Sequence, residues 1–486
     1  MKIYLLNPPY LPNFGRGARW QEIGRAGTLY YPIWLAYATA NLGKSHTVCL
    51  IDAVAKKWTN IDVLNDVKSF KPDLVVIDSS FPSLNNDMQV ASYLKENYLE
   101  PIKIVLVGPP TSRYSEKILS NTGVDVTARL EYDFTLLALA DILEGSESLE
   151  CLLNVDGISF KYNDKILHNP NRPLSTSKDL DDVPFVSEVY DKHLNIRDYF
   201  LGQSLYPEVQ ILTGRGCPNQ CTFCSWPQTL TGRKYRVRSI SNVIDELAWI
   251  EDNLRIKEVF FEDDTFTTSK TRVLEFCREY KERKLSIVWS CNARVDSLDL
   301  ETMKEMRKSN CRLLIAGYES GNDSILKSVK KGITVNDIRS FARSAKKAKL
   351  MVHGDFIIGL PGENQNTIEN TKLLIKEIKP EILQVSVASP FPGTEFYHWC
   401  DQNGYLTTND PNEYLDESGH QKAIVSYPWL STEDIASAVD DILRNYYLSA
   451  DYIPVALQQI FRQNGLDEAK RILYSAKQFI SYVKNR

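Results

Sequence analysis

Gly214-Arg215-Gly216-Cys217-Pro218-Asn219-Gln220-Cys221-Thr222-Phe223-Cys224 brings three cysteines into eight residues, directly after the apolar run VQILT at 209–213. Glycine and proline in this stretch predict a turn-rich loop that follows a β-strand. Cysteine thiolates are the usual ligands of iron–sulfur cubanes, which normally take four of them. Cys217, Cys221 and Cys224 are therefore the expected ligands of a [4Fe-4S] cluster with one iron open to a small ligand.

A structural zinc site is the main alternative for these cysteines, and it needs a fourth sulfur or nitrogen ligand at short spacing. The next cysteine is Cys277, and no histidine lies between His193 and His353. The ligand count therefore favours the open cluster over zinc, and also over a role in core packing.

The sequence around the cysteines alternates strand-like and helical segments. From residue 208 the apolar runs are VQILTGRG, EVFFEDD, IVWSCNAR, RLLIAGYES, VHGDFIIGLPG and ILQVSVASP. Six strand–helix units are too few for a closed eight-unit barrel, so we expect a partial (β/α)6 TIM barrel over residues 206–395. Its active site should lie at the carboxyl ends of the strands.

Residues 1–148 show the same rhythm in the runs KIYLLN, TVCLID, DLVVIDS and KIVLVG. This pattern predicts an α/β domain of the Rossmann-like type, with a parallel sheet and helices on both faces. Small and turn-forming residues follow the strands, where ligands of such sheets bind. Asp52, Ser79, Ser80, Gly108 and Pro109 are the candidates, and ordinary loops of an open sheet are the alternative reading.

Residues 149–205 lose this rhythm and are expected to form a linker with a small hairpin, and residues 396–486 a mainly helical C-terminal region. The last helix has an apolar stripe with basic residues around it. The stripe comprises Leu466, Ala469, Leu473, Ala476, Ile480 and Val483, and the basic residues are Lys470, Arg471, Lys477, Lys484 and Arg486. We expect this helix to dock on the barrel, with an anionic membrane surface as the alternative.

The composition limits the class of protein. A net charge of −5 argues against nucleic acid as a partner, and nine cysteines are too sparse for a disulfide scaffold. No stretch approaches the roughly 20 apolar residues that cross a bilayer, and MKIYLLNPPY is not built like a signal peptide. A cytoplasmic location is expected, with peripheral membrane attachment as the variant that the last helix allows.

The spacing Cys-x-x-x-Cys-x-x-Cys, with an aromatic residue before the last cysteine, resembles the radical SAM superfamily. The resemblance implies that S-adenosylmethionine (SAM) chelates the open iron and is cleaved to a deoxyadenosyl radical, with an electron from a flavodoxin or ferredoxin. It also implies a set of SAM contacts at later strand ends. These are Phe223, Glu262, Asp263, Asp264, Asn292, Glu319, Ser320, Gly359 and Leu360.

A parallel α/β domain before such a barrel resembles the cobalamin-binding branch of the superfamily. One departure is that Asp52-Ala53-Val54-Ala55-Lys56 lacks the histidine and glycine of modules that ligate cobalt through histidine. Histidine ligation is therefore not expected. Two readings stay open, in which the domain binds cobalamin without histidine or keeps the fold without the cofactor.

Within this branch, segments at 224–229, 235–239, 289–292, 354–356 and 390–394 resemble the HpnJ-type hopanoid-biosynthesis enzymes. This resemblance implies hydrogen abstraction from a sugar or polyol, free or lipid-linked, followed by rearrangement such as ring contraction to a cyclitol, or by dehydration. The candidate substrate contacts are Gln228, Tyr235, Arg236, His353, Asp355, Gln384 and Ser386. The alternatives are a cobalamin-dependent radical SAM methyltransferase and a sensor without turnover.

Overall fold

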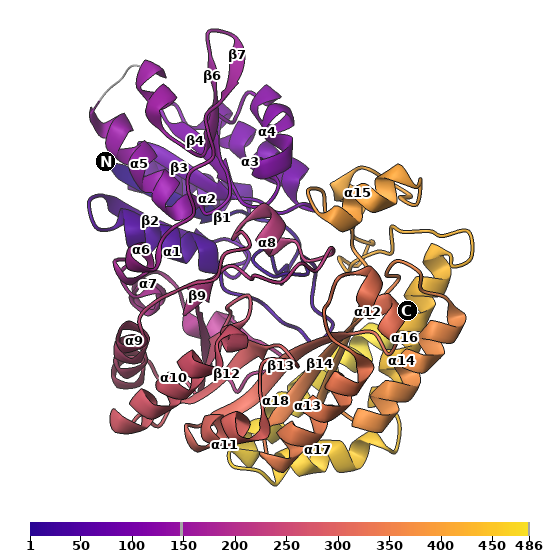
Figure 1. The fold of residues 1–486 in the computed structure, drawn as a ribbon. Coiled ribbons are helices and arrows are strands. Elements are labelled where there is room, and N and C mark those ends of the chain that lie inside the picture. The colour runs from indigo at the N-terminus through magenta and orange to yellow at the C-terminus, as the bar shows by residue number, and fades with distance from the viewer. Residues whose placement is uncertain (146–148, 485–486) are drawn as a thin grey trace.

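The computed structural model describes residues 1–145 and 149–484, which form two α/β units and a helical C-terminal region (Figure 1). The first unit contains a seven-stranded sheet in the order β2-β1-β3-β4-β5-β6-β7. Strands β1 to β5 are parallel, and alternate side chains of β1 enter two separate cores on the two faces. The elements are β1 (Lys2–Asn7), α1 (Ile33–Leu42), β2 (Thr47–Asp52), α2 (Asn60–Phe70), β3 (Leu74–Asp78), α3 (Leu84–Asn97), β4 (Lys103–Val107), α4 (Thr111–Ser120), β5 (Val126–Ala128) and α5 (Tyr132–Gly145).

The hairpin expected inside the linker belongs to this sheet. Strands β6 (Ile158–Tyr162) and β7 (Lys165–His168) continue it in antiparallel fashion beside β5. The first unit thus extends beyond residue 148, because the edge of β5 offers backbone groups with which β6 pairs. Helices α6 (Ser177–Asp181) and α7 (Val186–His193) then lead to the second unit.

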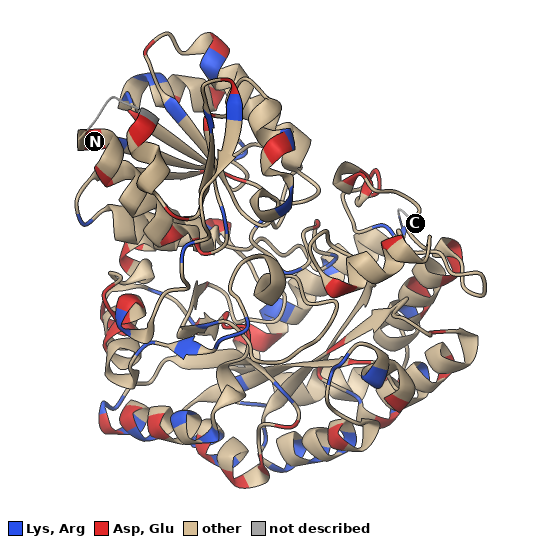
Figure 2. Ribbon diagram, turned by 45° about the horizontal axis from the view of Figure 1, so that its top comes forward, with Lys and Arg blue, Asp and Glu red and all other residues tan. Residues whose placement is uncertain are grey.

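The second unit has six parallel strands in the order β15-β14-β13-β12-β11-β8, which confirms the partial barrel. Its strands are β8 (Glu208–Ile211), β11 (Glu258–Phe261), β12 (Val288–Ala293), β13 (Cys311–Glu319), β14 (Met351–Ile358) and β15 (Ile382–Val387). The helices between and after them are α9 (Ile240–Asn253), α10 (Lys270–Glu282), α11 (Leu300–Lys308), α12 (Asp323–Ser328), α13 (Val335–Lys347) and α14 (Gln365–Ile378). Figure 2 shows Lys and Arg interspersed with Asp and Glu along the outer helices.

Helix caps fix where several of the barrel helices begin. Thr334 accepts a hydrogen bond from the backbone of Asp337 at the start of α13, and the Asp337 carboxylate accepts one from the backbone of Thr334. This reciprocal box satisfies donors that would otherwise be unpaired in the first turn. It sets α13 directly after the loop that carries Lys331.

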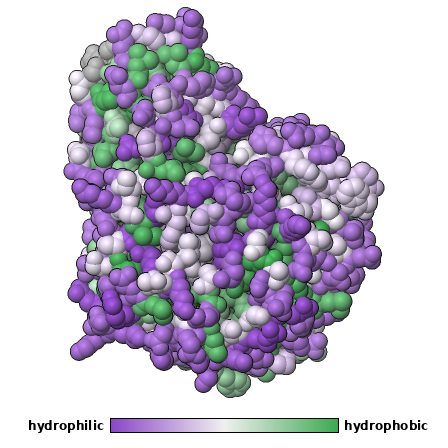
Figure 3. Space-filling view, viewed as in Figure 1, coloured by the Kyte–Doolittle hydropathy of each residue, from purple (hydrophilic) through white to green (hydrophobic). Residues whose placement is uncertain are grey.

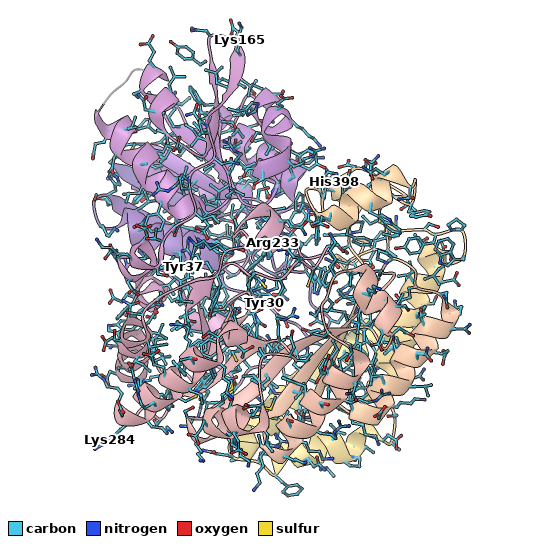
Figure 4. All side chains as sticks on the ribbon, viewed as in Figure 1. Tyr30, Tyr37, Lys165, Arg233, Lys284 and His398 are labelled. Carbon is cyan, nitrogen blue, oxygen red and sulfur yellow. The ribbon has the colours of Figure 1, made fainter. Side chains whose placement is uncertain are left out.

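Buried ion pairs join the two units. Arg215 contacts Asp133 at 2.7 Å and Arg236 contacts Glu131 at 2.7 Å, all four side chains being almost fully buried. Tyr37, which Figure 4 shows between the units, accepts a hydrogen bond from the backbone N–H of Leu212 at 2.7 Å. The carboxyl ends of both sheets therefore face a common interior.

Helices α15 (Glu395–Gln402), α16 (Thr432–Tyr447), α17 (Tyr452–Ile460) and α18 (Gly465–Lys484) complete the described chain. Helix α18 docks on the barrel as expected, but through the side that carries Glu468, Arg471 and Tyr482. Its expected apolar stripe is divided: Leu466 is 82% and Leu473 71% exposed, whereas Ala476 and Ile480 line the central cavity. Arg486 lies outside the described residues. No helix in residues 1–145 and 149–484 combines the length and hydropathy needed to cross a membrane.

Candidate active site

The cysteine loop is held between strand β8 and the short ladder of β9 (Gly214–Arg215) with β10 (Arg236–Val237). Gly216 has φ +83° and a Cβ there would lie 2.3 Å from the carbonyl oxygen of Lys234, so the turn requires glycine. Asp264 accepts hydrogen bonds from the Gly216 N–H and the Thr231 hydroxyl, each at 2.9 Å. The loop is thereby tied to the end of β11.

The three thiols of this loop are free and lie near one another. Burial raises the pKa of Cys221 and Cys224, and the neighbouring thiols of the loop raise both further. Among the described residues no group of three His, Cys, Asp or Glu is close enough to hold a single metal ion. A cubane spreads its ligands over separate irons, so three thiols on one loop fit a cluster better than a lone ion.

The acidic end of β11 is occupied by an arginine that sequence reasoning missed. Arg19 donates to Asp264 Oδ1 and to the backbone carbonyl of Glu262, both at 2.9 Å, and its guanidinium stacks 3.9 Å from the Trp226 ring. Burial raises the pKa of Glu262 to about 7 despite the opposing charge of Arg19. The expected site for the SAM ammonium thus already contains one cation.

Asp263 differs in role from Glu262. It is fully buried, is not part of the cavity wall, and accepts hydrogen bonds from the N–H and hydroxyl of Thr213 at 2.6 Å. Burial raises its pKa to about 6. Asn292 on β12 donates to the Asp263 carbonyl at 2.9 Å, which positions the ends of β11 and β12 relative to each other.

A buried ion pair marks the end of β13. Lys331 lies 2.6 Å from Glu319, which has φ +62°. A Cβ on Gly317 would come within 2.4 Å of the Glu319 carboxylate and 2.8 Å of the Lys331 ammonium, so glycine leaves room for the pair. Ser320 beside it has a buried hydroxyl without a partner. The sequence around Lys331 contains no motif that would have identified it as a site residue.

The segment after β14 forms a tight, buried turn. Gly359 has φ +100°, its N–H donates to Glu363 Oε2 at 2.5 Å, and its carbonyl accepts from the Tyr427 hydroxyl at 2.8 Å. Burial raises the pKa of Glu363 to about 7. Leu360 and Phe223 are buried in the main core. These positions suit an apolar wall beside the cysteine loop.

A cavity of about 390 Å³ fills the lumen of the partial barrel. It is walled by Glu262 and Asn292 on the SAM side, by Tyr30 of the N-terminal segment, and by helices α16 to α18. Figure 4 places Tyr30 near the centre of the molecule. A volume of this size suits a small organic substrate, and its wall connects that space with the expected SAM contacts.

Three of the seven expected substrate contacts line this cavity: His353, Asp355 and Gln384. His353 Nε2 lies 3.2 Å from Asp355 Oδ1, yet neither ring nitrogen nor that oxygen makes a well-oriented hydrogen bond. Burial lowers the pKa of His353 to about 3, with Arg471 adding to it, and burial raises that of Asp355 well above its usual range. His353 is therefore neutral at pH 7, the charged form of Asp355 is disfavoured by its burial, and both residues line the cavity with polar atoms that have no hydrogen-bond partner.

The other four expected substrate contacts lie outside the cavity wall. Gln228 donates to the carbonyls of Thr222 and Cys224, and Arg236 is in the ion pair with Glu131. The Tyr235 hydroxyl points to the backbone of Phe266, while Ser386 accepts a long hydrogen bond from Gln384. These side chains brace the loops around the site.

Some of the expected cobalamin contacts are bound to other side chains of the protein, and the others line a small space. Asp52 is enclosed by hydrogen bonds from Asn7 and Tyr199, and Ser80 by one with Ser83. Ser79, Gly108 and Pro109 line a space of about 10 Å³ between the two units, together with other residues of both.

Three residues that line this space carry a buried polar atom without a hydrogen-bond partner: Trp34 Nε1, the Ser79 hydroxyl and the Tyr132 hydroxyl. Asp78 also lines it, and burial raises the pKa of this carboxyl to about 7. The donors and acceptors therefore fit a polar ligand.

Comparison with known proteins gives a matching family and similar relatives. The profile of the radical SAM superfamily matches residues 211–375. The uncharacterized methyltransferase PH0819 of Pyrococcus horikoshii is 30% identical over 467 residues, covering 96% of both chains. The cytidylyl-2-hydroxyethylphosphonate methyltransferase of Streptomyces wedmorensis is 26% identical and covers 87% of each chain.

A solved structure shares the complete architecture. The radical SAM methyltransferase TsrM of Kitasatospora setae, solved with cobalamin and a [4Fe-4S] cluster bound, superposes with a TM-score of 0.73. Sequence identity is 14%, and the match covers 99% of each chain. The likeness is therefore one of fold, from the first strand of the first unit to the C-terminal helices.

Proposed function

Because the chain belongs to the radical SAM superfamily, we propose that this enzyme is a cobalamin-dependent radical SAM methyltransferase. The feature that carries the proposal is the 390 Å³ cavity, whose wall contains expected SAM contacts together with His353 and Asp355, which have polar atoms without a hydrogen-bond partner. A full-length relative named as a methyltransferase supports it. The expectation of hydrogen abstraction from a sugar followed by ring contraction or dehydration receives no such support, and the methyltransferase alternative replaces it.

Cys217, Cys221 and Cys224 would hold the [4Fe-4S] cluster, whose chemistry when reduced is the cleavage of SAM. Around it, Glu262 and Asp264 offer carboxylates to the SAM ammonium, and Lys331 offers a cation to the SAM carboxylate. Arg19 already fills the acidic end of β11, so it has to shift or be shared when an ammonium enters. A flavodoxin or ferredoxin type of protein would supply the electron.

Ser79, Gly108, Pro109, Trp34 and Tyr132 would surround cobalamin, which supplies methyl-transfer chemistry when bound. The unpartnered atoms of Trp34 and Tyr132 fit a ligand that brings polar groups to this edge of the sheet. The space has the size of a water molecule, so its two walls must part to admit a corrin.

His353 and Asp355 would bind and orient the substrate. The neutral imidazole of His353 offers one donor and one acceptor, and the Asp355 carboxyl, whose charged form is disfavoured by burial, offers a second hydrogen-bonding group. Together they would hold the methyl-accepting atom of the substrate in the cavity. Gln384 on the next strand supplies a further amide contact.

The test uses reconstituted, reduced full-length protein under anaerobic conditions with SAM. S-adenosylhomocysteine and deoxyadenosine are quantified in the same sample, with and without hydroxocobalamin. We expect S-adenosylhomocysteine to form only when cobalamin is added. Deoxyadenosine alone, unaffected by cobalamin, would return the assignment to hydrogen abstraction and rearrangement. Neither product, with the cluster proven by its visible spectrum, would favour a sensor.

A further inference from the structure

The cavity is lined by polar groups of the barrel strands and by apolar side chains of the C-terminal helices. His353, Asp355 and Gln384 share it with the expected SAM contacts Glu262 and Asn292. Several apolar side chains of α16, α18 and the turn after α16 also line it. These are Leu443, Tyr447, Leu448, Ile472, Ala476, Phe479 and Ile480. The cavity therefore suits a molecule whose reacting end forms hydrogen bonds and whose body is apolar.

The apolar wall reaches the surface. Leu448 is 57% exposed and Ile480 is 44% exposed, although both line the cavity. Eight of the fourteen exposed large hydrophobic side chains of the described residues lie between positions 448 and 480, less than a tenth of the chain. They are Leu448, Ile453, Leu457, Phe461, Leu466, Leu473, Tyr474 and Ile480. In Figure 3, hydrophobic residues come to the surface at the lower edge, near the place where Figure 1 labels α17.

The exposed face of α18 also carries a row of positive charge. Leu466, Leu473 and Ile480 repeat every seven residues, and Lys470, Lys477 and Lys484 repeat at the same interval four positions later. Because residues four apart are neighbours on a helix, the lysines run beside the apolar row. All three lysines are exposed.

The acidic residues of α18 do not offset this charge. Glu468 is buried against Arg312 and Arg471, and Asp467 is paired with Lys257. The protein as a whole is acidic, with a net charge of −5, so the row of lysines is a local feature.

We propose that the outer face of α17 and α18 docks on an anionic lipid bilayer, and that a lipid-borne substrate enters the cavity between Leu448 and Ile480. An apolar row flanked by lysines is the arrangement of helices that lie in a bilayer interface. Leu448 and Ile480 each belong both to that exposed surface and to the wall of the cavity. This inference rests on the proposed function for its chemistry, whereas the docking itself does not.

Vesicle flotation tests the docking with full-length protein and two lipid compositions. Vesicles of phosphatidylcholine with phosphatidylglycerol should bind the wild type, and vesicles of phosphatidylcholine alone should bind it more weakly. Leu466→Glu with Leu473→Glu should lower the affinity at least about tenfold, since it places charge on the apolar row. Lys470→Glu with Lys477→Glu should lower it by about fivefold or more for each lysine.

The matched control is Leu99→Glu with Leu373→Glu, which adds the same charge at exposed leucines elsewhere. Equal binding by control and test variants, no binding by the wild type, or indifference to phosphatidylglycerol would each overturn the proposal. Circular dichroism of all variants confirms that the fold is kept, because the substituted side chains are exposed.

The entrance is tested with cis-parinaric acid, a fluorescent fatty acid. Ala476→Trp fills the cavity wall and should weaken binding of the probe, whereas Ser481→Trp, exposed on the same helix and outside the wall, should not. Equal binding of the probe by the two variants would overturn the proposal that the substrate enters between Leu448 and Ile480. Vesicle binding without S-adenosylhomocysteine formation would contradict the proposed function alone, and the reverse result would contradict only this inference.

Discussion

Arg312 and Glu468 lie 156 positions apart in the sequence and form an ion pair of 2.7 Å that is almost fully buried. Arg312 also contacts Glu258 of β11 at 2.8 Å, and Glu468 contacts Arg471 at 2.9 Å. The network connects the floor of the barrel with α18. It fixes which face of this helix turns inward, and hence which face is left to the solvent.

Replacing Glu468 by Gln should be strongly destabilising, because it leaves Arg312 and Arg471 with less compensation for their buried charge. Breaking a buried pair in this way costs about 3–5 kcal/mol of unfolding free energy. Urea denaturation measures it. Glu377→Gln is the control, since its pair with Arg339 is exposed and should contribute less than about 1 kcal/mol. Similar losses for both variants would mean that α18 is held by apolar contacts instead.

Tyr132→Phe should leave the stability unchanged or slightly higher, because it removes a buried hydroxyl that has no partner. The same change should reduce the amount of cobalamin retained after gel filtration, measured from the visible spectrum. Tyr37→Phe is the matched control at the same interface. It should cost about 1 kcal/mol, since its hydroxyl is hydrogen-bonded to the backbone of Leu212. Unchanged cobalamin retention in Tyr132→Phe would remove this residue from the proposed site.

Glu208→Gln should change how stability depends on pH. Burial raises the pKa of Glu208 to about 8 from an ordinary 4.5, and the nearby Glu258 carboxylate adds to it. The folded state therefore prefers the protonated form, so the wild type loses stability as pH rises from about 5 to about 8. The variant should match the wild type near pH 5 and exceed it near pH 8 in denaturation curves. Glu369→Gln, at an exposed site, should follow the wild type throughout.

Gly317→Ala should weaken SAM binding about tenfold, with little loss of stability. The added methyl group displaces the Glu319 and Lys331 side chains, which are mobile at their ends but are needed in place for charge-assisted hydrogen bonds. Isothermal titration of the anaerobic, cluster-loaded protein measures the affinity. Gly145→Ala meets no atom within 4 Å and serves as the control. A variant that binds SAM normally would show that the pair does not position it.

The sequence predicted the barrel well because each of its six strands is a local apolar run with its own turn signals. The pairing of β6 with β5 could not be read in the same way, since it depends on an edge formed elsewhere in the chain. The inward face of α18 was predicted only in part for a related reason. Its buried charges are stabilised by Arg312, and no local pattern reveals a partner so far away.

The residues of the candidate site were likewise predicted where a local pattern marked them and missed where none did. His353, Asp355 and Gln384 were found because they lie on strands of the predicted barrel, where Asp355 pairs directly with Gln384 and His353 lies two positions before Asp355. Arg19 and Lys331 were missed because each is a single cation in a loop, without a motif around it. Their role becomes visible only when the fold brings them to carboxylates from other strands.

The wall of the central cavity is assembled from three separate parts of the polypeptide: the segment around Arg19 to Tyr30, the barrel strands, and the final helices. A radical intermediate survives only where solvent and stray hydrogen donors are kept out. An excised barrel would therefore lack two of the three parts that form the cavity wall. It could bind the iron–sulfur cluster, but a radical formed there would be open to solvent. For this protein the unit of catalysis, and the smallest piece that can be usefully transplanted or redesigned, is the whole chain.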